Sequence, residues 1–264
     1  MIEAMLLAAG FSTRLHPLTC DIPKPMLPFL NRKLLDFTVG YLSHFGIKRL
    51  STNAHHGRTP FIKELSMHHA LNIHPFIEDS ILGTGGGIQN MRSFLTQDDF
   101  MVINCDFVCD INLKEAYAKH KSSGAIATLV LVEHEDQQKY GEIGLDDRGQ
   151  IVQFPKQNLS TTTPIEKGMF SGIHFLNRKI FDLFPNKSSF CIVRDVYQPA
   201  LEKGITFNGY LSKARWLDVG EVQKYATAQF QLLETPFKWM TTLFEDSIIE
   251  AGKAPSNRFA VGNF

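Results

Sequence analysis

The first thirty residues constrain the fold of this chain more than any other part of the sequence. An apolar run over residues 4–8 ends abruptly in a turn of small residues, Ala9, Gly10 and Ser12. Arg14 follows the turn, and ten residues further on Lys24 is held between two prolines. A buried strand that delivers a tight turn of backbone N–H groups, with two cations beside it, is typical of a polyphosphate site. The spacing matches neither a P-loop nor a G-x-G-x-x-G dinucleotide turn.

Strand-like and helix-like segments alternate through the first half of the chain. Short apolar runs predict strands over 4–8, 49–53, 72–77, 100–104 and 125–133. Helical spacing predicts helices over 34–42, 60–69, 87–94 and 113–121, the third of them opened by a glycine cluster. This order predicts an α/β fold with a mostly parallel sheet and right-handed crossovers.

The second half changes character. Residues 141–154 predict two short strands around the turn Asp147-Arg148-Gly149. Further strands are expected over 169–176, 207–211 and 214–217, and helical segments up to 184, over 194–203 and over 220–233. From residue 235 the tail has a helical piece, 237–251, rich in apolar side chains. We expect this piece either to pack on the sheet or to form a dimer contact; its apolar residues are Phe237, Trp239, Met240, Leu243 and Phe244.

The composition indicates which kinds of molecule this protein does not bind. Lysine plus arginine equals aspartate plus glutamate, 27 each, so nothing indicates a nucleic-acid surface. No apolar stretch approaches the roughly 20 residues that cross a bilayer, and the first apolar run leads directly into the glycine turn; we expect a cytoplasmic protein with no membrane partner. The four cysteines are too scattered for a disulfide framework, and Cys105 and Cys109 are expected to be small residues around a strand end.

Three further motifs suggest chemistry. Residues 82–86 read Leu-Gly-Thr-Gly-Gly, a glycine-rich stretch at the start of a helix. Asp106 follows a strand, where ligands of α/β sheets usually bind. Residues 215–220 read Arg-Trp-Leu-Asp-Val-Gly and place a second carboxylate, Asp218, at another strand end. Taken singly, a flexible turn and helix-capping aspartates would explain these features.

Together the motifs resemble those of the sugar-1-phosphate nucleotidylyltransferases. The resemblance lies in residues 8–19 and 24–28, then in the three motifs above, in the family's order, and covers residues 1 to about 230. The sequence Asn53-Ala54-His55 further resembles the short mannose-1-phosphate and N-acetylmuramate-1-phosphate branch. The chain departs from the family pattern at Ser12 and Cys105, where glycine is usual. No hexapeptide repeat of a β-helix follows.

The resemblance implies a Rossmann-like three-layer α/β sandwich around a mostly parallel mixed sheet. It implies one nucleotidyltransferase domain, 1–233, with a nucleotide-binding part up to about 135 and a sugar-binding part over 136–233. Residues 234–264 would form a helical extension and tail.

The resemblance also assigns the donor side of a site. Arg14 and Lys24 would contact the phosphates of a nucleoside triphosphate, or the pyrophosphate that leaves. Asp106 and Asp218 would hold Mg²⁺. The nucleotide would lie against Leu7, Ala8, Ala9, Gly10, Ser12, Thr13, Asn53, Gly83, Thr84, Gly85, Gly86 and Asp106, with the base at Gly85 and Gly86.

The acceptor side is less defined. Gly141 and Gly172 resemble the glycines that flank the sugar. Lys156 would be the cation for the sugar phosphate, although the glutamate that usually precedes this lysine is missing. Lys167 competes for that role, and an ordinary surface lysine remains open for either.

The implied reaction is transfer of a nucleotidyl group from a nucleoside triphosphate, GTP or UTP being favoured, to a sugar 1-phosphate. The products would be pyrophosphate and a nucleotide sugar, a precursor for cell-wall or polysaccharide synthesis. The protein would be a monomer or a homodimer. Two alternatives remain open: a cytidylyltransferase acting on a non-sugar phosphate such as phosphocholine, held by aromatic residues near Tyr140 and Phe170, and a non-catalytic protein that binds nucleotide sugars.

Overall fold

The computed structural model describes residues 2–55, 57–69, 71–155, 157–159 and 162–243. Its strands are β1 (Glu3–Leu7), β2 (Pro28–Phe29), β3 (Arg32–Lys33), β4 (Arg49–Ala54), β5 (Asn72–Ile77), β6 (Asp99–Asn104), β7 (Phe107–Cys109), β8 (Ala127–Val132), β9 (Glu142–Leu145), β10 (Ile151–Phe154), β11 (Gln157–Asn158), β12 (Glu166–Asn177), β13 (Asn208–Ser212) and β14 (Trp216–Asp218). Its α-helices are α1 (Leu34–His44), α2 (Arg58–Leu65), α3 (Gly83–Asn90), α4 (Leu113–Ser123), α5 (Gln137–Tyr140), α6 (Gln198–Glu202), α7 (Val222–Glu234) and α8 (Lys238–Leu243). Short 3₁₀ segments cover Thr13–Leu15, Lys24–Met26, Met91–Phe94 and Arg178–Leu183, and a π-helical turn covers Val193–Tyr197.

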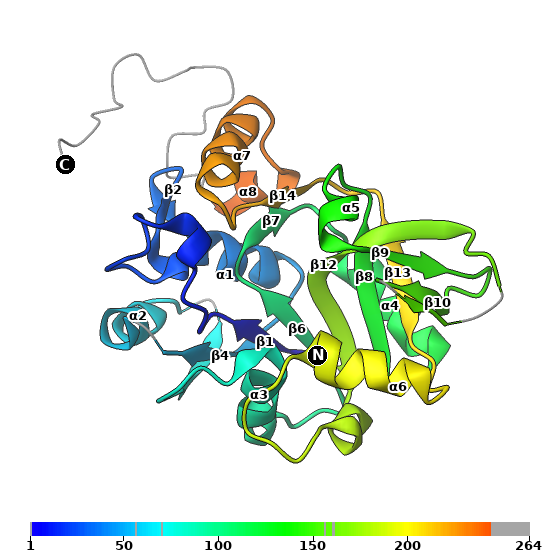
Figure 1. Cartoon of the computed structure of the whole chain (residues 1–264). Coiled ribbons are helices and arrows are strands. Elements are labelled where there is room, and N and C mark those ends of the chain that lie inside the picture. The colour runs from blue at the N-terminus through cyan, green and yellow to red at the C-terminus, as the bar shows by residue number, and fades with distance from the viewer. Residues whose placement is uncertain (1, 56, 70, 156, 160–161, 244–264) are drawn as a thin grey trace.

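A ten-stranded mixed sheet forms the centre of the molecule (Figure 1). Strands β6, β1, β4 and β5 are parallel neighbours, as the alternation of the first half predicts. The long strand β12 then runs antiparallel to β6, β8 and β9 and joins the parallel part to the hairpin β9–β10. The predicted α/β fold with a mixed central sheet is confirmed, and every antiparallel pair of this sheet includes a strand from the second half of the chain.

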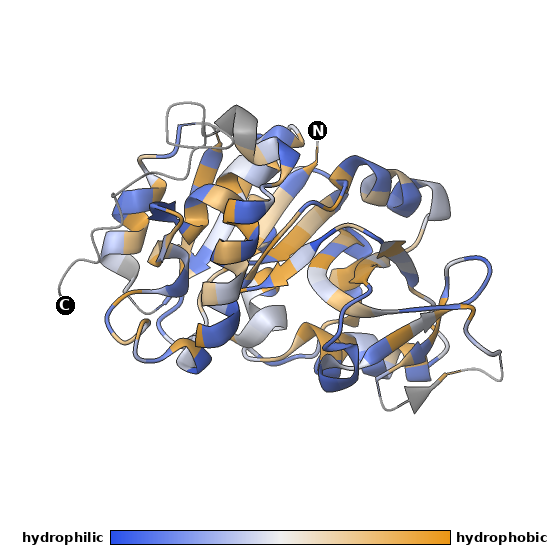
Figure 2. Ribbon diagram, turned by 90° about the horizontal axis from the view of Figure 1, so that it is seen from above, coloured by the Kyte–Doolittle hydropathy of each residue, from blue (hydrophilic) through white to orange (hydrophobic). Residues whose placement is uncertain are grey.

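Alternating side chains of the strands supply two separate cores. Ala4 and Leu6 of β1 point to one face of the sheet and Met5 to the other, and β6 alternates in the same way. The first face packs against α1, α2, α4 and α8, and the second against α3, α6 and the segment around Phe190. Figure 2 shows the largely hydrophobic strands between these helices. The helices cover the two faces of the sheet and leave the carboxyl ends of its parallel strands uncovered.

Helix α3 corrects one sequence-based expectation. The predicted helix begins at residue 87, after the glycine cluster, whereas α3 begins at Gly83 and contains the cluster. Packing explains the difference, because the backbone of α3 lies against the segment around Phe190, where a side chain would collide. A Cβ on Gly85 would lie 2.3 Å from the Phe190 ring. Close helix packing therefore outweighs the low helical propensity of glycine.

The start of the C-terminal extension packs on the sheet domain. Phe237, Trp239 and Met240 are buried, and the Trp239 indole donates a hydrogen bond of 3.0 Å to the carbonyl of Cys109. Of the two alternatives for these apolar residues, the structure therefore shows intramolecular packing. Phe244 lies outside the described residues.

Helices of the described part of the chain are all too short or too polar to cross a membrane.

Candidate active site

Two adjoining cavities lie at the carboxyl ends of the parallel strands. The β1 cavity, about 210 Å³, is lined by the turn after β1 together with Lys24, Asn53, Glu78, Ile81, Gly83, Thr84 and Cys105. The hairpin cavity, about 290 Å³, is lined by Arg14, Asp218 and residues of the β9–β10 and β12 region. Asn104 and Asp106, at the end of β6, line both cavities. Asp106 therefore stands in a shared wall.

Asn53 fixes the turn that follows β1. Its side-chain oxygen accepts the backbone N–H groups of Ala8 at 2.7 Å and of Ala9 at 3.2 Å. These two N–H groups are therefore already hydrogen-bonded within the chain, and the Asn53 side chain holds the turn in place. Gly10 has no neighbour within 4 Å of the position that a Cβ would take, so the turn is open to a ligand at this residue.

Glu78 is a buried carboxylate that the sequence motifs do not single out. It accepts a hydrogen bond of 2.7 Å from the Asn53 amide and another from the N–H of Leu82, at the start of α3. Its carboxylate thus ties the turn after β1 to the glycine helix. Only its position four residues before the glycine stretch could have indicated this role.

The glycines of α3 serve packing as well as any ligand. Gly83 and Thr84 line the β1 cavity, whereas Gly85 and Gly86 are buried against residues 188–192. The Thr84 hydroxyl accepts a hydrogen bond from the N–H of Ile192. The prediction that a base lies on Gly85 and Gly86 is untested, and the residues of α3 that line the cavity in this structure, Gly83 and Thr84, lie two positions earlier.

Lys24 and Asp106 both line the β1 cavity and form an ion pair there. The lysine is buried, and its ammonium nitrogen lies 3.6 Å from an oxygen of Asp106, whose side chain is 31% exposed. The 3₁₀ turn Lys24–Met26, with prolines before and within it, fixes this lysine. A buried cation whose partner is partly open to solvent is well placed to receive a second anion.

Strand pairing brings Asp218 to Asp106. β14 runs antiparallel to β7 with Asp218 opposite Phe107, the residue after Asp106, and the N–H of Val219 donates to the carbonyl of Asp106. Gly220 is needed here, because a Cβ would lie 2.9 Å from the Asp218 carboxylate and 3.1 Å from the Arg14 guanidinium. In the Trp-x-Asp-x-Gly motif, the aspartate therefore supplies a carboxylate, and the glycine leaves room for the Arg14 guanidinium.

Asp218 accepts three hydrogen bonds. The donors are the N–H of Gly220 at 2.7 Å, the Lys224 ammonium at 2.9 Å and the Tyr140 hydroxyl at 3.0 Å. Burial by itself would raise the pKa of Asp218, but these hydrogen bonds outweigh burial and hold the pKa below its usual value. Asp218 is therefore anionic, and Lys224 supplies the balancing charge.

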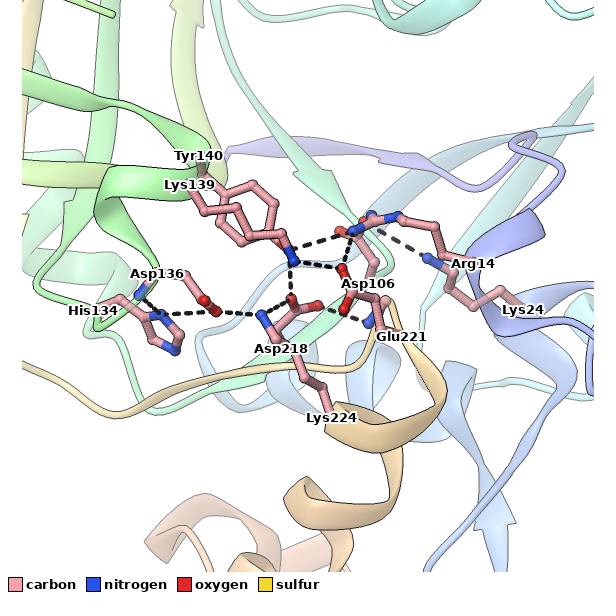
Figure 3. A network of polar contacts seen from close by, with 11 residues as sticks. Arg14, Lys24, Asp106, His134, Asp136, Lys139, Tyr140, Asp218, Glu221 and Lys224 are labelled. Carbon is pink, nitrogen blue, oxygen red and sulfur yellow. Dashed lines mark hydrogen bonds and ion pairs between the residues drawn. The ribbon is translucent and has the colours of Figure 1, made fainter.

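Lys224, Asp136, Lys139 and Glu221 extend this polar network, and sequence motifs predict none of them (Figure 3). Lys224 also pairs with Asp136, and Glu221 pairs with both Lys139 and Arg14. The signal that could have found them is proximity: Lys139 directly precedes Tyr140-Gly141, and Glu221 directly follows the Asp-Val-Gly motif.

Gly141 and Gly172 both line the hairpin cavity. Each has a positive φ, 95° and 87°, and a Cβ would meet Pro155 or the Asn104 side chain. Lys156 lies outside the described residues. Lys167 pairs with Glu142 at 3.6 Å and is not among the residues that line the cavity.

The carboxylates of Asp106, in the shared wall, and of Asp218, in the hairpin cavity, form a donor set that fits a magnesium ion. Asp106 and Asp218 both line the hairpin cavity, and carboxylate oxygens are the ligands that Mg²⁺ prefers. A separate cluster, Asp36, Glu64 and His68, has ligand atoms within 4.8 Å of one another. It shares no residue with either cavity, and Lys33 already pairs with Glu64.

Comparison with known proteins identifies the family. Residues 3–235 match the nucleotidyl transferase family. The chain belongs to this family. It is 28% identical over 236 residues to the D-glycero-α-D-manno-heptose 1-phosphate guanylyltransferase of Aneurinibacillus thermoaerophilus, covering 88% of this chain and 98% of that protein.

Other relatives are longer. The mannose-1-phosphate guanylyltransferase of Mycobacterium tuberculosis is 28% identical over 235 residues, covering 88% of this chain and 65% of that protein. The chain spans only 61–65% of the length of three such curated relatives. The crystal structure of HddC from Yersinia pseudotuberculosis complexed with GMP-PN superposes with a TM-score of 0.73 at 25% identity, covering 88% of this chain and all of that one.

Proposed function

We propose that this nucleotidyl transferase family member is a Mg²⁺-dependent enzyme that joins a nucleoside triphosphate and a sugar 1-phosphate. The observation that carries the proposal is the shared wall. Asp106 stands between two cavities, with Lys24 lining one and Arg14 lining the other. Such a site can hold two phosphate compounds side by side around one carboxylate.

In the proposed reaction, an oxygen of the sugar phosphate attacks the α-phosphorus of the triphosphate. A new P–O bond forms, the bond between the α- and β-phosphates breaks, and its electron pair leaves with pyrophosphate. The nucleophile is already an anion, so no general base is required. Catalysis then consists of holding two anions together and neutralising the charge that grows on the leaving group.

The chain's residues would divide this work. The turn after β1, with Gly83 and Thr84, would hold the nucleotide in the β1 cavity, with Lys24 on its phosphates. Arg14 would bind phosphate at the boundary, and Gly141 and Gly172 would leave room for the sugar. Asp106 and Asp218 would hold Mg²⁺, which supplies further positive charge to the phosphate oxygens.

Within this proposal, residues up to about 135 bind the nucleotide, 136–233 bind the sugar, and 234–264 extend the domain. GTP or UTP is the expected donor, since the relatives include guanylyltransferases and a uridylyltransferase. We further propose a cytoplasmic monomer or homodimer.

A phosphocholine cage at Tyr140 is disfavoured. The ammonium groups of Lys139 and Lys224 already lie 5.3 and 5.2 Å from the centre of this ring. A quaternary ammonium ligand would have to compete with both cations.

A matrix of four nucleoside triphosphates against a panel of sugar 1-phosphates and phosphocholine tests the proposal, with pyrophosphate release as the readout. We expect release with GTP or UTP and one or a few sugar phosphates. Release only with CTP and phosphocholine, or nucleotide-sugar binding without any release, would overturn it in favour of the corresponding alternative.

A further inference from the structure

Two cations share one carboxylate oxygen beside the hairpin cavity, which Arg14 lines. Oε1 of Glu221 lies 2.8 Å from the Lys139 ammonium and 3.2 Å from a guanidinium nitrogen of Arg14 (Figure 3). The side chains of Lys139 and Arg14 are 52% and 51% exposed, and that of Glu221 is 29% exposed. Both cations are therefore accessible to a ligand, and the chain's own carboxylate occupies the place between them.

Lys139 is held in this position from both sides of its short helix. Asp136, just before α5, pairs with Lys224. Tyr140, the last residue of α5, donates to Asp218 and accepts a hydrogen bond of 3.3 Å from Arg14. The segment around Lys139 is thus tied through its neighbours' side chains to Asp218 and to Arg14.

A phosphate group fits between these two cations better than a carboxylate does. It carries more charge and three terminal oxygens, so it can accept from a guanidinium and an ammonium group at the same time. Hydrogen bonding from Lys139 lowers the pKa of Glu221, so the side chain is an anion at neutral pH. An arriving phosphate therefore meets a resident anion that it can displace.

We propose that Lys139 and Arg14 form a phosphate clamp, and that Glu221 is the anion that occupies the clamp until a phosphate group displaces it from Arg14. The clamp rests on the proposed function and adds Lys139 as a phosphate-binding residue. Two phosphate sources share this chemistry: the pyrophosphate part of the donor and the monoester of the acceptor.

Isothermal titration calorimetry on the full chain tests the clamp, with magnesium pyrophosphate and mannose 1-phosphate as separate probes. The variants are Lys139→Gln, Lys139→Arg and Glu221→Gln. The controls are Lys121→Gln, which removes a similarly exposed lysine paired with Asp99, and Glu234→Gln, at the far end of α7 and about 18 Å along its axis from the site.

We expect Lys139→Gln to weaken binding of one probe about fivefold, Lys139→Arg to restore most of it, and Glu221→Gln to strengthen it about fivefold. Neither control should change either dissociation constant. The probe that responds identifies the phosphate source. A merely structural role of Glu221 in holding its neighbours would give the opposite sign, so weaker binding by Glu221→Gln overturns the proposal.

Unchanged affinity of Lys139→Gln for both probes, or no binding of either probe by the wild type, overturns it as well. The experiment is independent of turnover. A wild type that binds pyrophosphate and responds to the variants, but shows no pyrophosphate release in the substrate matrix, would disprove the proposed function and leave the clamp supported.

Discussion

Asp106 and Asp218 carry the same charge in different surroundings. Asp218 is buried and accepts hydrogen bonds from three donors, whereas Asp106 is partly exposed and pairs with Lys24 at 3.6 Å. Replacing Asp218 would also leave Lys224 without one of its two carboxylates. A substitution at Asp106 therefore tests a role in the reaction with less disturbance of the fold than a substitution at Asp218.

We expect Asp106→Asn and Lys24→Ala each to lower turnover by about a hundredfold or more, because each removes charge that stabilises the transferring phosphate. The measurement is pyrophosphate release with the best substrate pair. Lys121→Gln and Glu234→Gln, which remove charges outside both cavities, should retain wild-type rates. Full activity of both site variants would contradict the assignment.

A second prediction at this scale concerns His174. This buried side chain contacts the Tyr197 hydroxyl, and burial lowers its pKa to about 3. In the unfolded chain its pKa is about 6.5, so as the pH falls below that value the unfolded state binds a proton that the folded state excludes. The free energy of unfolding therefore decreases as the pH is lowered from about 6.5 to 3.

Urea denaturation at pH 7 and pH 5 measures this effect. The wild type should lose about 2 kcal/mol more over this interval than His174→Gln, which has no proton to bind there. Contributions from His120 and the carboxylates are common to both proteins and cancel. Parallel losses would show that His174 does not titrate as its burial implies.

At the scale of elements, the glycines of the site differ in what they make possible. Gly10, in the turn after β1, has open space around it, whereas Gly85, in α3, is pressed against the Phe190 ring. The first is suited to a ligand and the second to helix packing.

Alanine at these two positions should separate the two roles. Gly85→Ala should lower the free energy of unfolding by about 1–3 kcal/mol through overpacking, as seen in chemical denaturation. Gly10→Ala should leave stability unchanged and weaken nucleotide binding, because the new methyl group occupies space beside the turn. Wild-type stability of Gly85→Ala would disprove the packing role of Gly85. Unaltered nucleotide affinity of Gly10→Ala would disprove the ligand-binding role of Gly10.

At the scale of the whole molecule, the C-terminal extension supports the site indirectly. Trp239 packs against Tyr41 of α1 and donates to Cys109 of β7, and β7 pairs with β14, which carries Asp218. The extension therefore braces the two-stranded ladder that brings the two aspartates together.

Trp239→Ala should lower the free energy of unfolding by about 3–5 kcal/mol, because it removes a large buried side chain and leaves a cavity. Phe230→Ala, at a position that is 67% exposed on α7, is the matched control and should change stability by less than about 0.5 kcal/mol. Equal unfolding midpoints for the two variants in urea would show that the extension does not stabilise the domain.

Local patterns predict much of this architecture. The strand over 72–77 and the hairpin around Gly149 agree with the structure, because hydrophobic alternation and turn residues act over a few positions. The start of α3 could not be predicted in this way, since it depends on a contact with Phe190, more than a hundred residues away.

The sequence by itself determined which residues could carry the chemistry: the turn with Arg14 and Lys24, the glycine stretch, and the two aspartates at strand ends. Only the tertiary structure decided how they meet. Pairing of β14 with β7 sets Asp218 beside Asp106, and α5 and α7 bring Lys139 and Glu221 to Arg14. The physical reason is range: propensity and patterning act between neighbours along the chain, whereas the pairing of charges depends on the register of strands and the packing of helices.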